Sequence, residues 1–412
     1  MLMVLLNISN KGKFAFCLVA LFVFSWPISA QQRYRIYLDA DFSSTQASSN
    51  SIKQGIEVAL AEENFQINSF IFELVTKDHH GNSLRSKRNL EAFVSDQRGL
   101  VVFSGLHSPP LLANKEFINR NNILMLVPWA AAGPITRSGD DENWIFRLSI
   151  DDSNAGTFIT EQALKEGFKK PLLLLENTGW GRSNEHTMTQ ALQQKNIKPS
   201  NIKWFNWGLG INQAKLLLRE AKLDNSDVIF FVGNANEGKV FIKAMAELES
   251  DIILPIRSHW GITGGNFAET ISVKQRENID LQFIQTRFSF LTQPKTALAK
   301  QVFKQASSRY SMIKSPSDIK AQTGFIHAYD LTKILIEAIK SASLSGDRER
   351  DSQAIKEALE NLQNPVKGLI KTYDKPFSQY SASNANAHEA LSIADYVMAY
   401  YNDNNNIVLL KK

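Results

Sequence analysis

Residues 35–78 contain the segments RIYLDADF (35–42), SIKQGIEVALAEEN (51–64) and SFIFELVTKD (69–78). The first and third are short apolar runs typical of strands, and the middle one repeats apolar residues at helical spacing. A strand, a helix and a second strand in this order are the repeating unit of a parallel sheet, because parallel strands need a crossover connection. This stretch therefore predicts an α/β fold.

The same alternation continues along the chain. Further predicted strands are GLVVFSG (99–105), ILMLVPW (123–129), PLLLLENT (171–178), IKWFNWG (202–208), DVIFFVGN (227–234) and IILPIRSHWG (252–261). Further predicted helices cover 83–96, 111–122, 155–168, 184–196, 212–222, 237–250, 296–310 and 324–343. The series restarts after WIFRLSID (144–151), so we predict two Rossmann-like lobes, each a parallel sheet covered by helices on both faces. The tail, residues 392–412, is expected to form a hairpin with its Asn-rich stretch as the turn.

Composition sets broad limits on the function. The chain has 412 residues, 43% of them hydrophobic and 21% charged, which is long enough for two domains. The net charge is only +5, and no run of five basic residues occurs. A nucleic-acid partner is therefore not indicated.

The N-terminus has the pattern of an export signal. Lys11 and Lys13 precede the apolar segment FAFCLVALFVFSW (14–26), which the small-residue motif PISA (27–30) follows. The apolar segment is short for a membrane span, which needs about 20 residues. We predict a signal peptide, residues 1–30, cleaved after Ala30; an uncleaved anchor is the alternative.

The single cysteine, Cys17, lies inside this predicted signal peptide. Cleavage would leave a mature chain without thiols. Export without disulfides is typical of a bacterial periplasmic protein whose core is large enough to be stable by itself. We therefore expect a periplasmic location.

Five segments carry a resemblance to a known family. They are IKQGIEVALAEEN (52–64), TKDHHGN (76–82), VVFSGLHSPPLLA (101–113), ILMLVPWAAAGPIT (123–136) and LLLLENTGWGRS (172–183). In this order they resemble the first helix, an acidic loop and the ligand loops of type I periplasmic binding proteins, the branched-chain amino acid and amide receptors of ABC transporters. The resemblance covers roughly residues 34–375.

The resemblance implies a discontinuous arrangement of the lobes. The chain is expected to cross between them near residues 148, 290 and 378. The N-terminal lobe would then comprise 31–148 and 291–378, and the C-terminal lobe 149–290 and 379–412. Two open α/β sheets joined by hinge strands form a cleft that can close around a solute.

The segment VPWAAAGPIT (127–136) includes the end of a predicted strand, and the alanines and glycine in it have side chains too small for chemistry. By resemblance, Ala130 and Ala131 stand where the family binds the amino and carboxylate groups of its ligand. Ala131 replaces a hydroxyl residue there, so only its backbone N–H can serve. Small side chains would let a ligand approach the main chain, and Trp129 is either a wall of the pocket or part of the core.

The preceding ligand loop supplies hydroxyl and imidazole groups. Ser108 stands where the family holds a carboxylate with a serine hydroxyl, and His107 and Ser104 are close enough to substitute. The structural alternative is that Ser108 caps a helix whose first residue is Pro109, and both roles are compatible because helix N-termini attract anions.

In the second lobe, Trp180 falls where the family places an aromatic residue against the ligand. Asn234 and Asn236 end another predicted strand, and each is either a ligand contact or a turn residue.

His259 and Trp260 stand where many amino-acid receptors have an acidic residue for the ligand ammonium. A histidine gives no permanent negative charge. Asp41 or Asp39 could supply that charge instead, although aspartates at strand ends are often turn formers.

Three tryptophans thus converge by resemblance on one cleft and suggest a ligand bulkier or flatter than leucine, aromatic or amide-bearing.

We identified no nucleophile elbow, HExxH motif or phosphate loop, and GLGINQ (208–213) lacks the third glycine of a dinucleotide fingerprint. We therefore expect neither enzyme activity, nor a cofactor, nor a metal. The expected function is delivery of a small molecule to an ABC transporter permease by a monomer. The alternative is a ligand-sensing module acting on a membrane sensor kinase or cyclase.

Overall fold

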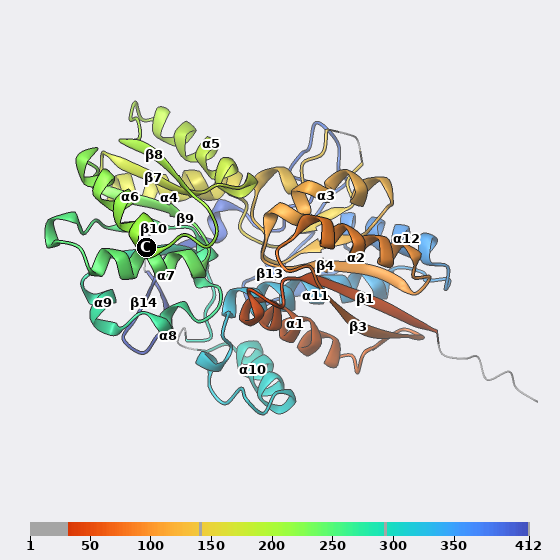
Figure 1. Cartoon of the computed structure of the whole chain (residues 1–412). Helices are drawn as coiled ribbons and strands as arrows, with labels where there is room; N and C mark the ends of the chain where they lie inside the picture. Colours follow the sequence, from red (N-terminus) through yellow and green to blue (C-terminus); the bar gives the residue numbers. More distant parts are fainter. Residues whose placement is uncertain (1–31, 140–141, 292–294, 411–412) are drawn as a thin grey trace, which may run out of the picture. The chain divides into compact units, whose positions relative to one another are not determined.

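The computed structural model describes residues 32–139, 142–291 and 295–410, and the predicted signal peptide with its cleavage site lies outside them. Two sheets dominated by parallel strands are each flanked by helices (Figure 1). The predicted two-lobed α/β fold is confirmed. Within the described ranges, no helix has both the length and the apolar character needed to cross a membrane.

The first sheet has the strand order β2-β3-β1-β4-β5-β6. Its strands are β1 (Arg33–Ala40), β2 (Gln66–Ile67), β3 (Phe70–Asp78), β4 (Gly99–Ser104), β5 (Met125–Val127) and β6 (Ile145–Arg147). All pairings are parallel except that of the short β2 with β3. The chain runs from β1 outward to β3 and then returns to β4 on the other side of β1, so the strand order reverses between β1 and β4.

The second sheet has the order β15-β14-β11-β10-β9-β7-β8. Its strands are β7 (Pro171–Glu176), β8 (Asn201–Phe205), β9 (Val228–Val232), β10 (Ile256–Ser258), β11 (Leu281–Thr286), β14 (Tyr396–Tyr401) and β15 (Ile407–Leu409). The five strands β7–β11 are parallel and reverse their order between β7 and β9, whereas β14 and β15 are antiparallel. The predicted C-terminal hairpin is thus confirmed as β14–β15.

Helices follow most strands. They are α1 (Gln46–Ala61), α2 (Ser83–Ser95), α3 (Ser108–Arg120), α4 (Asp152–Lys165), α5 (Gly179–Gln193), α6 (Ile211–Leu223), α7 (Ala235–Ala246), α8 (Phe267–Thr270), α9 (Val273–Glu277), α10 (Ala297–Arg309), α11 (Gln322–Ser341) and α12 (Arg348–Glu360). A two-stranded ribbon of β12 (Val366–Lys367) and β13 (Thr372–Tyr373) follows α12.

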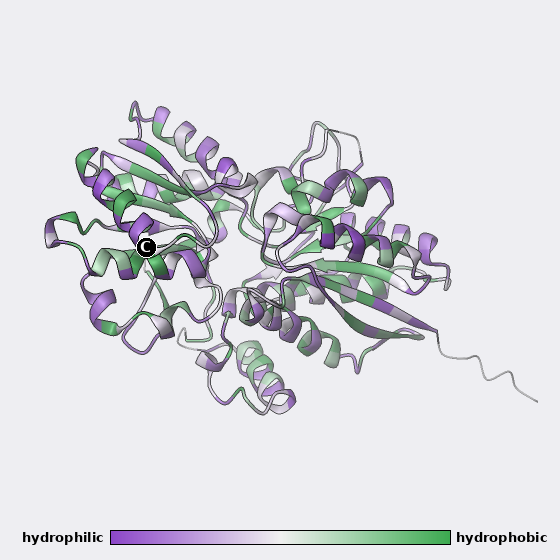
Figure 2. Cartoon of the chain, in the orientation of Figure 1, coloured by the Kyte–Doolittle hydropathy of each residue, from purple (hydrophilic) through white to green (hydrophobic). Residues whose placement is uncertain are grey.

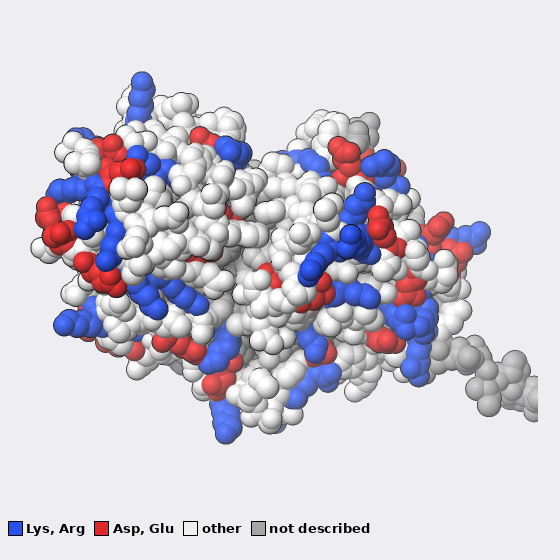
Figure 3. All heavy atoms as spheres, viewed as in Figure 1, with Lys and Arg blue, Asp and Glu red and all other residues white. Residues whose placement is uncertain are grey.

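The strands carry the hydrophobic residues of the core, as Figure 2 shows. Helices α1 and α11 pack against each other at Gly55, where an added Cβ would lie 2.3 Å from the Phe325 carbonyl oxygen. This close approach excludes any side chain at residue 55. On the face drawn in Figure 3, acidic and basic side chains are interspersed, which is typical of a solvated surface.

A buried guanidinium holds three chain segments together next to β6. Arg147 is fully buried and donates to the Ala132 carbonyl at 2.9 Å, to Asp151 Oδ1 at 2.8 Å and to both carboxylate oxygens of Glu389. Its backbone N–H also donates to the His388 carbonyl at 2.9 Å, so the returning chain lies along the edge of the first sheet before it enters β14. The lobe boundaries near 148, 290 and 378 stay predictions.

We predict that Arg147→Met destabilises the protein by about 3–5 kcal/mol, because the buried carboxylates of Asp151 and Glu389 would lose their fully buried partner and keep only the more exposed Arg137. Urea denaturation measures this loss. The matched control is Lys340→Ala, which removes the more exposed ion pair with Glu63 and is expected to cost no more than about 1 kcal/mol. An equal loss in both variants would contradict the role given to Arg147.

Candidate functional site

The loops at both points of strand reversal are the first places to search for a site. In open α/β sheets, ligands bind outside the carboxyl ends of the strands, where the order reverses. In the first sheet these ends lead into residues 41–45 after β1 and 105–107 after β4. In the second sheet they lead into residues 177–178 after β7 and 233–234 after β9. Two neighbouring cavities lie at these loops.

The first is a small space that we call the tryptophan cavity. It is lined by Leu106, His107, Ser108, Pro109, Trp129, Ala131, Glu176, Trp180, Asn234, Trp260 and Gly261, which come from both sheets and their loops. Its volume of about 10 Å³ has room for about one water molecule.

The three tryptophans fill most of this space themselves. Trp129 and Trp260 are each 1% exposed, and their ring centroids lie 6.1 Å apart at an edge-to-face angle. The ring of Trp180 lies so close to Gly261 that an added Cβ there would be 2.6 Å from its Cη2. The tryptophans therefore pack as parts of the protein core as well as lining the cavity.

The structure brings most of the predicted site residues together. His107, Ser108, Trp129, Ala131, Trp180, Asn234 and Trp260 line the tryptophan cavity, whereas Asp41, Ala130 and His259 do not. The ligand roles predicted for these residues stay predictions.

The loop after β5 is fixed by its backbone. The Ala132 N–H donates to Ser108 Oγ at 3.2 Å, and the Ala131 carbonyl accepts from the Asp152 N–H at 3.0 Å. Helix α3 begins at Ser108 with His107 at the N-cap position, so Ser108 is not the cap that the sequence suggested. A hydroxyl that accepts one hydrogen bond still has its own hydrogen to donate, so Ser108 remains able to donate to a bound group.

Asp41 contacts His107 and orders the loop after β1. Its Oδ1 accepts from the N–H groups of Ser43 and Ser44, and its Oδ2 lies 3.3 Å from His107 Nε2. Burial alone would raise the pKa of Asp41, but the hydrogen bonds from His107 and Ser44 outweigh burial and lower it. Asp39 points elsewhere and accepts from Ser86 Oγ at 2.6 Å. Asp41 is therefore a charged residue that positions His107.

His259 is engaged with an acid that the sequence did not reveal. Its Nδ1 accepts from the Trp260 N–H at 2.9 Å, so the ring hydrogen is on Nε2, which lies 2.9 Å from Asp152 Oδ1. Asp152 is the first residue of α4, and both side chains are fully buried. This pair joins the loop after β10 to α4, and neither of its residues lines the tryptophan cavity.

Glu176 is the acid of the tryptophan cavity, and our reading of the sequence missed it. It is the last residue of β7 and is 1% exposed. Thr178 Oγ1 donates to its Oε1 at 3.0 Å, and Asn234 Nδ2 donates to its Oε2 at 2.9 Å. Burial raises the pKa of Glu176 to about 7. The available signal was the charged residue that ends the apolar strand PLLLLE (171–176).

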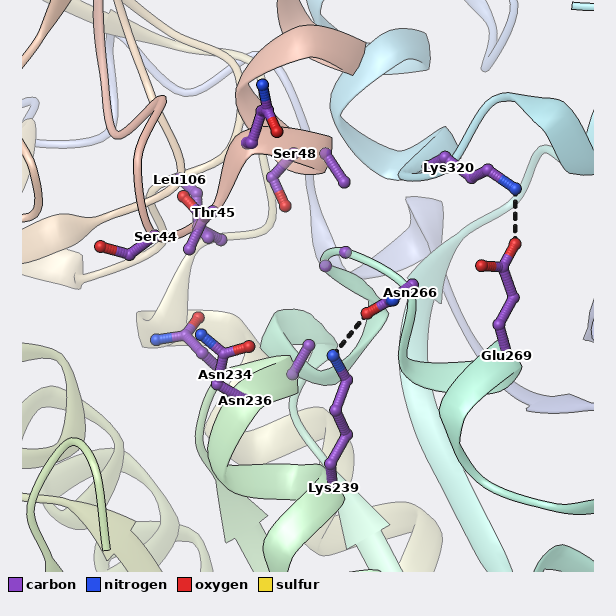
Figure 4. Close-up of a pocket in the computed structure, with 15 residues that line it drawn as sticks. Ser44, Thr45, Ser48, Leu106, Asn234, Asn236, Lys239, Asn266, Glu269 and Lys320 are labelled. Atoms are coloured by element: carbon purple, nitrogen blue, oxygen red, sulfur yellow. Dashed lines mark hydrogen bonds and ion pairs between the residues drawn. The ribbon is translucent and has the colours of Figure 1, made fainter.

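The second cavity, which we call the α1–α7 chamber, lies at the N-termini of these two helices (Figure 4). Its volume is about 320 Å³, and Leu106 and Asn234 line it as well as the tryptophan cavity. The other lining residues are Ser44, Thr45, Gln46, Ala47, Ser48, Ala235, Asn236, Lys239, Gly264, Gly265, Asn266, Glu269 and Lys320. The volume of this chamber is within the usual size range of small-molecule sites.

In the part of the chain that the structure describes, no three His, Cys, Asp or Glu side chains lie together in a way that could hold a metal ion. His79 is buried and accepts from the Gly81 N–H, whereas the neighbouring His80 is exposed. Burial lowers the pKa of His79 to about 4.

Solved structures share this fold at low sequence identity. A type 1 periplasmic binding protein from Bordetella pertussis is 18% identical with a TM-score of 0.76, and the match covers 92% of this chain and 100% of that one. LivJ from Streptococcus pneumoniae, solved with isoleucine, is 19% identical with a TM-score of 0.71 and the same coverage. A solute-binding protein from R. palustris, solved with benzoate, is 14% identical with a TM-score of 0.73 over 92% and 95% of the two chains.

A search of curated protein sequences finds no match to the chain. The family description that matches is "Periplasmic binding protein", and the match extends over residues 37–394. The chain therefore belongs to the periplasmic binding protein family, whose members are solute-binding proteins rather than enzymes.

Proposed function

We propose that the protein binds a small organic solute between its two sheets and delivers it to an ABC transporter permease. The observation that carries this proposal is the position of the two cavities. Both are lined by loops from the carboxyl ends of both sheets, on each side of the points where the strand order reverses. A ligand held there would contact both lobes at once.

Such two-sided contact couples binding to lobe closure. A ligand shifts a conformational equilibrium only by its differential affinity for the two states. A solute that contacts Ser108 from the first sheet and Asn234 from the second has more contacts when the lobes are together. Closure would then produce the surface that a permease recognises.

The relatives limit the class of solute. LivJ was solved with an amino acid and the R. palustris protein with an aromatic acid, and both ligands carry a carboxylate. Family membership implies a periplasmic location, which agrees with the predicted signal peptide. For this chain we propose a small solute that carries a carboxylate, a permease as its partner and a monomeric state.

Binding is testable by intrinsic fluorescence, because Trp129, Trp180 and Trp260 lie at the tryptophan cavity. We expect at least one member of a panel of amino acids, amides and aromatic acids to give a saturable one-to-one change. The same ligand at about 100 times its Kd should stabilise the fold by about 2.7 kcal/mol. A ligand that changes fluorescence equally in urea-unfolded protein serves as the control for non-specific quenching. Failure of every panel member in both measurements would contradict the proposal.

Glu176 gives a second prediction, which concerns the ligand-free protein. Its pKa is about 7 when folded against an ordinary 4.5, so the stability it contributes is complete below about pH 4.5 and is lost as the pH rises through 7. Glu176→Gln is always neutral and avoids this loss. We expect the variant to gain roughly 3 kcal/mol of stability relative to the wild type between about pH 4.5 and about pH 8.

Urea denaturation at the two pH values measures this difference. The matched control is Glu247→Gln, which replaces an exposed carboxylate and should give a small, nearly pH-independent change. A Glu176→Gln effect that does not vary with pH would show that Glu176 is not held in the protonated form by burial.

A further inference from the structure

We infer that the solute is a small organic anion whose carboxylate binds in the α1–α7 chamber, on the Ser48 hydroxyl and the Lys239 ammonium. This inference rests on the proposed function and names the ligand class and the residues that select it.

The first observation is the space available. The tryptophan cavity holds about 10 Å³, whereas the α1–α7 chamber holds about 320 Å³. An organic solute is far larger than the former and fits the latter. The two share Leu106 and Asn234, so a ligand in the chamber lies directly beside the tryptophan cavity.

The second observation is that two helices begin at this chamber without side-chain caps. The N-cap residue of α1 is Thr45, whose hydroxyl donates to the Asp41 carbonyl at 3.0 Å instead of accepting from the helix. The N-cap residue of α7 is Asn234, whose amide donates to Glu176. First-turn N–H groups and the helix dipole both favour an anion at such positions.

The third observation is a buried hydroxyl without a partner. Ser48 lies in the first turn of α1, lines the chamber and is 0% exposed. Among the residues that the structure describes, no group forms a hydrogen bond with its Oγ. In Figure 4 this oxygen points from α1 toward the loop that carries Asn266. An unsatisfied buried polar group costs free energy, which an acceptor on a ligand would recover.

The fourth observation is the charge of the chamber. Lys239 Nζ donates to Asn266 Oδ1 at 2.6 Å, so its partner is a neutral amide, and two of its three hydrogens remain. Lys320 is paired with Glu269 at 2.5 Å, and the Glu237 carboxylate accepts from the Gly208 N–H. Among the described residues, Lys239 has no carboxylate partner, and Figure 4 shows its ammonium at Asn266 while Lys320 is paired with Glu269.

Together these features select a carboxylate over a neutral group of the same shape. A carboxylate has only acceptor atoms, which suits the ammonium, the hydroxyl and the helix N–H groups alike, and such charge-assisted hydrogen bonds are about twice as strong as neutral ones. An amide in the same position carries no charge to pair with the Lys239 ammonium, and its N–H groups would face the N–H donors of that ammonium and of the two helix N-termini. Gln46 and Asn236 at the same chamber would accommodate further hydroxyl or amide groups of the solute.

Matched acid and amide pairs test this selection by isothermal titration calorimetry. The probes are isoleucine against isoleucinamide, succinate against succinamide, and benzoate against benzamide. We expect binding of at least one acid, at least about tenfold weaker binding of its amide, and a similar loss for that acid in Lys239→Gln and in Ser48→Ala. The control is Lys243→Gln, which removes an exposed lysine one turn further along α7 and should leave the affinity unchanged.

The outcomes separate the inference from the proposed function. An amide that binds as tightly as its acid, or an acid whose affinity survives Lys239→Gln, would overturn the inference and leave solute binding established. Absence of binding for all six probes and for the wider panel would count against both. Circular dichroism of each variant confirms folding, and Lys239→Gln, at a half-buried position that lines the chamber, keeps the test valid if Ser48→Ala does not fold.

Discussion

Parallel strands cannot be joined by tight turns, and this constraint determines where the protein can bind anything. Each crossover helix returns the chain to the same end of the sheet, so the loops that follow the strands gather at the opposite edge. The strand order then reverses between β1 and β4 and again between β7 and β9, which opens a crevice at each sheet. Asp41, His107, Glu176 and Asn234 all come from these four strand ends. The position of the candidate site thus follows from the strand order, and its chemistry follows from the side chains at these strand ends.

Much of this arrangement could be predicted because buried parallel strands are nearly continuous apolar runs. ILMLVPW and PLLLLENT contain the strands β5 and β7, with the polar or small residues that follow at the edge of the sheet. The start of α1 was missed by five residues, since QASSN (46–50) is rich in residues of low helix propensity. Local side-chain contacts stabilise this start, because the Asp41 carbonyl accepts from the hydroxyls of both Thr45 and Ser49.

The candidate site was less predictable because partners across the fold decide the role of each side chain. His259 stands where the family has an acid, but its Nε2 lies 2.9 Å from the carboxylate of Asp152, which is more than one hundred residues earlier in the sequence. The expected aromatic wall became a packed group, since Trp129 and Trp260 contact each other and leave space for one water. Periodicity does not show such pairings. A space of about 320 Å³ lies beside α1 and α7, where neither the tryptophans nor the alanine loop pointed, and the ligand roles predicted for those residues stay predictions.

Burial has opposite consequences at two charged positions. Arg147 is satisfied by Asp151 and Glu389 and fixes the chain near β6, whereas Glu176 is buried with neutral partners and its raised pKa weakens the fold at neutral pH. A buried charged group that lowers the stability of the fold without a structural role is typical of a binding site. Together with the amide-bound Lys239 and with Ser48, whose hydroxyl has no partner among the described residues, this pattern supports the proposed binding at the two neighbouring cavities.

A crystal structure with a carboxylate selected by titration tests the central claim most directly. The account predicts electron density for the ligand between the N-termini of α1 and α7, with carboxylate oxygens within hydrogen-bond distance of Ser48 Oγ and Lys239 Nζ. Density for the ligand elsewhere, with only water in the α1–α7 chamber, would contradict it.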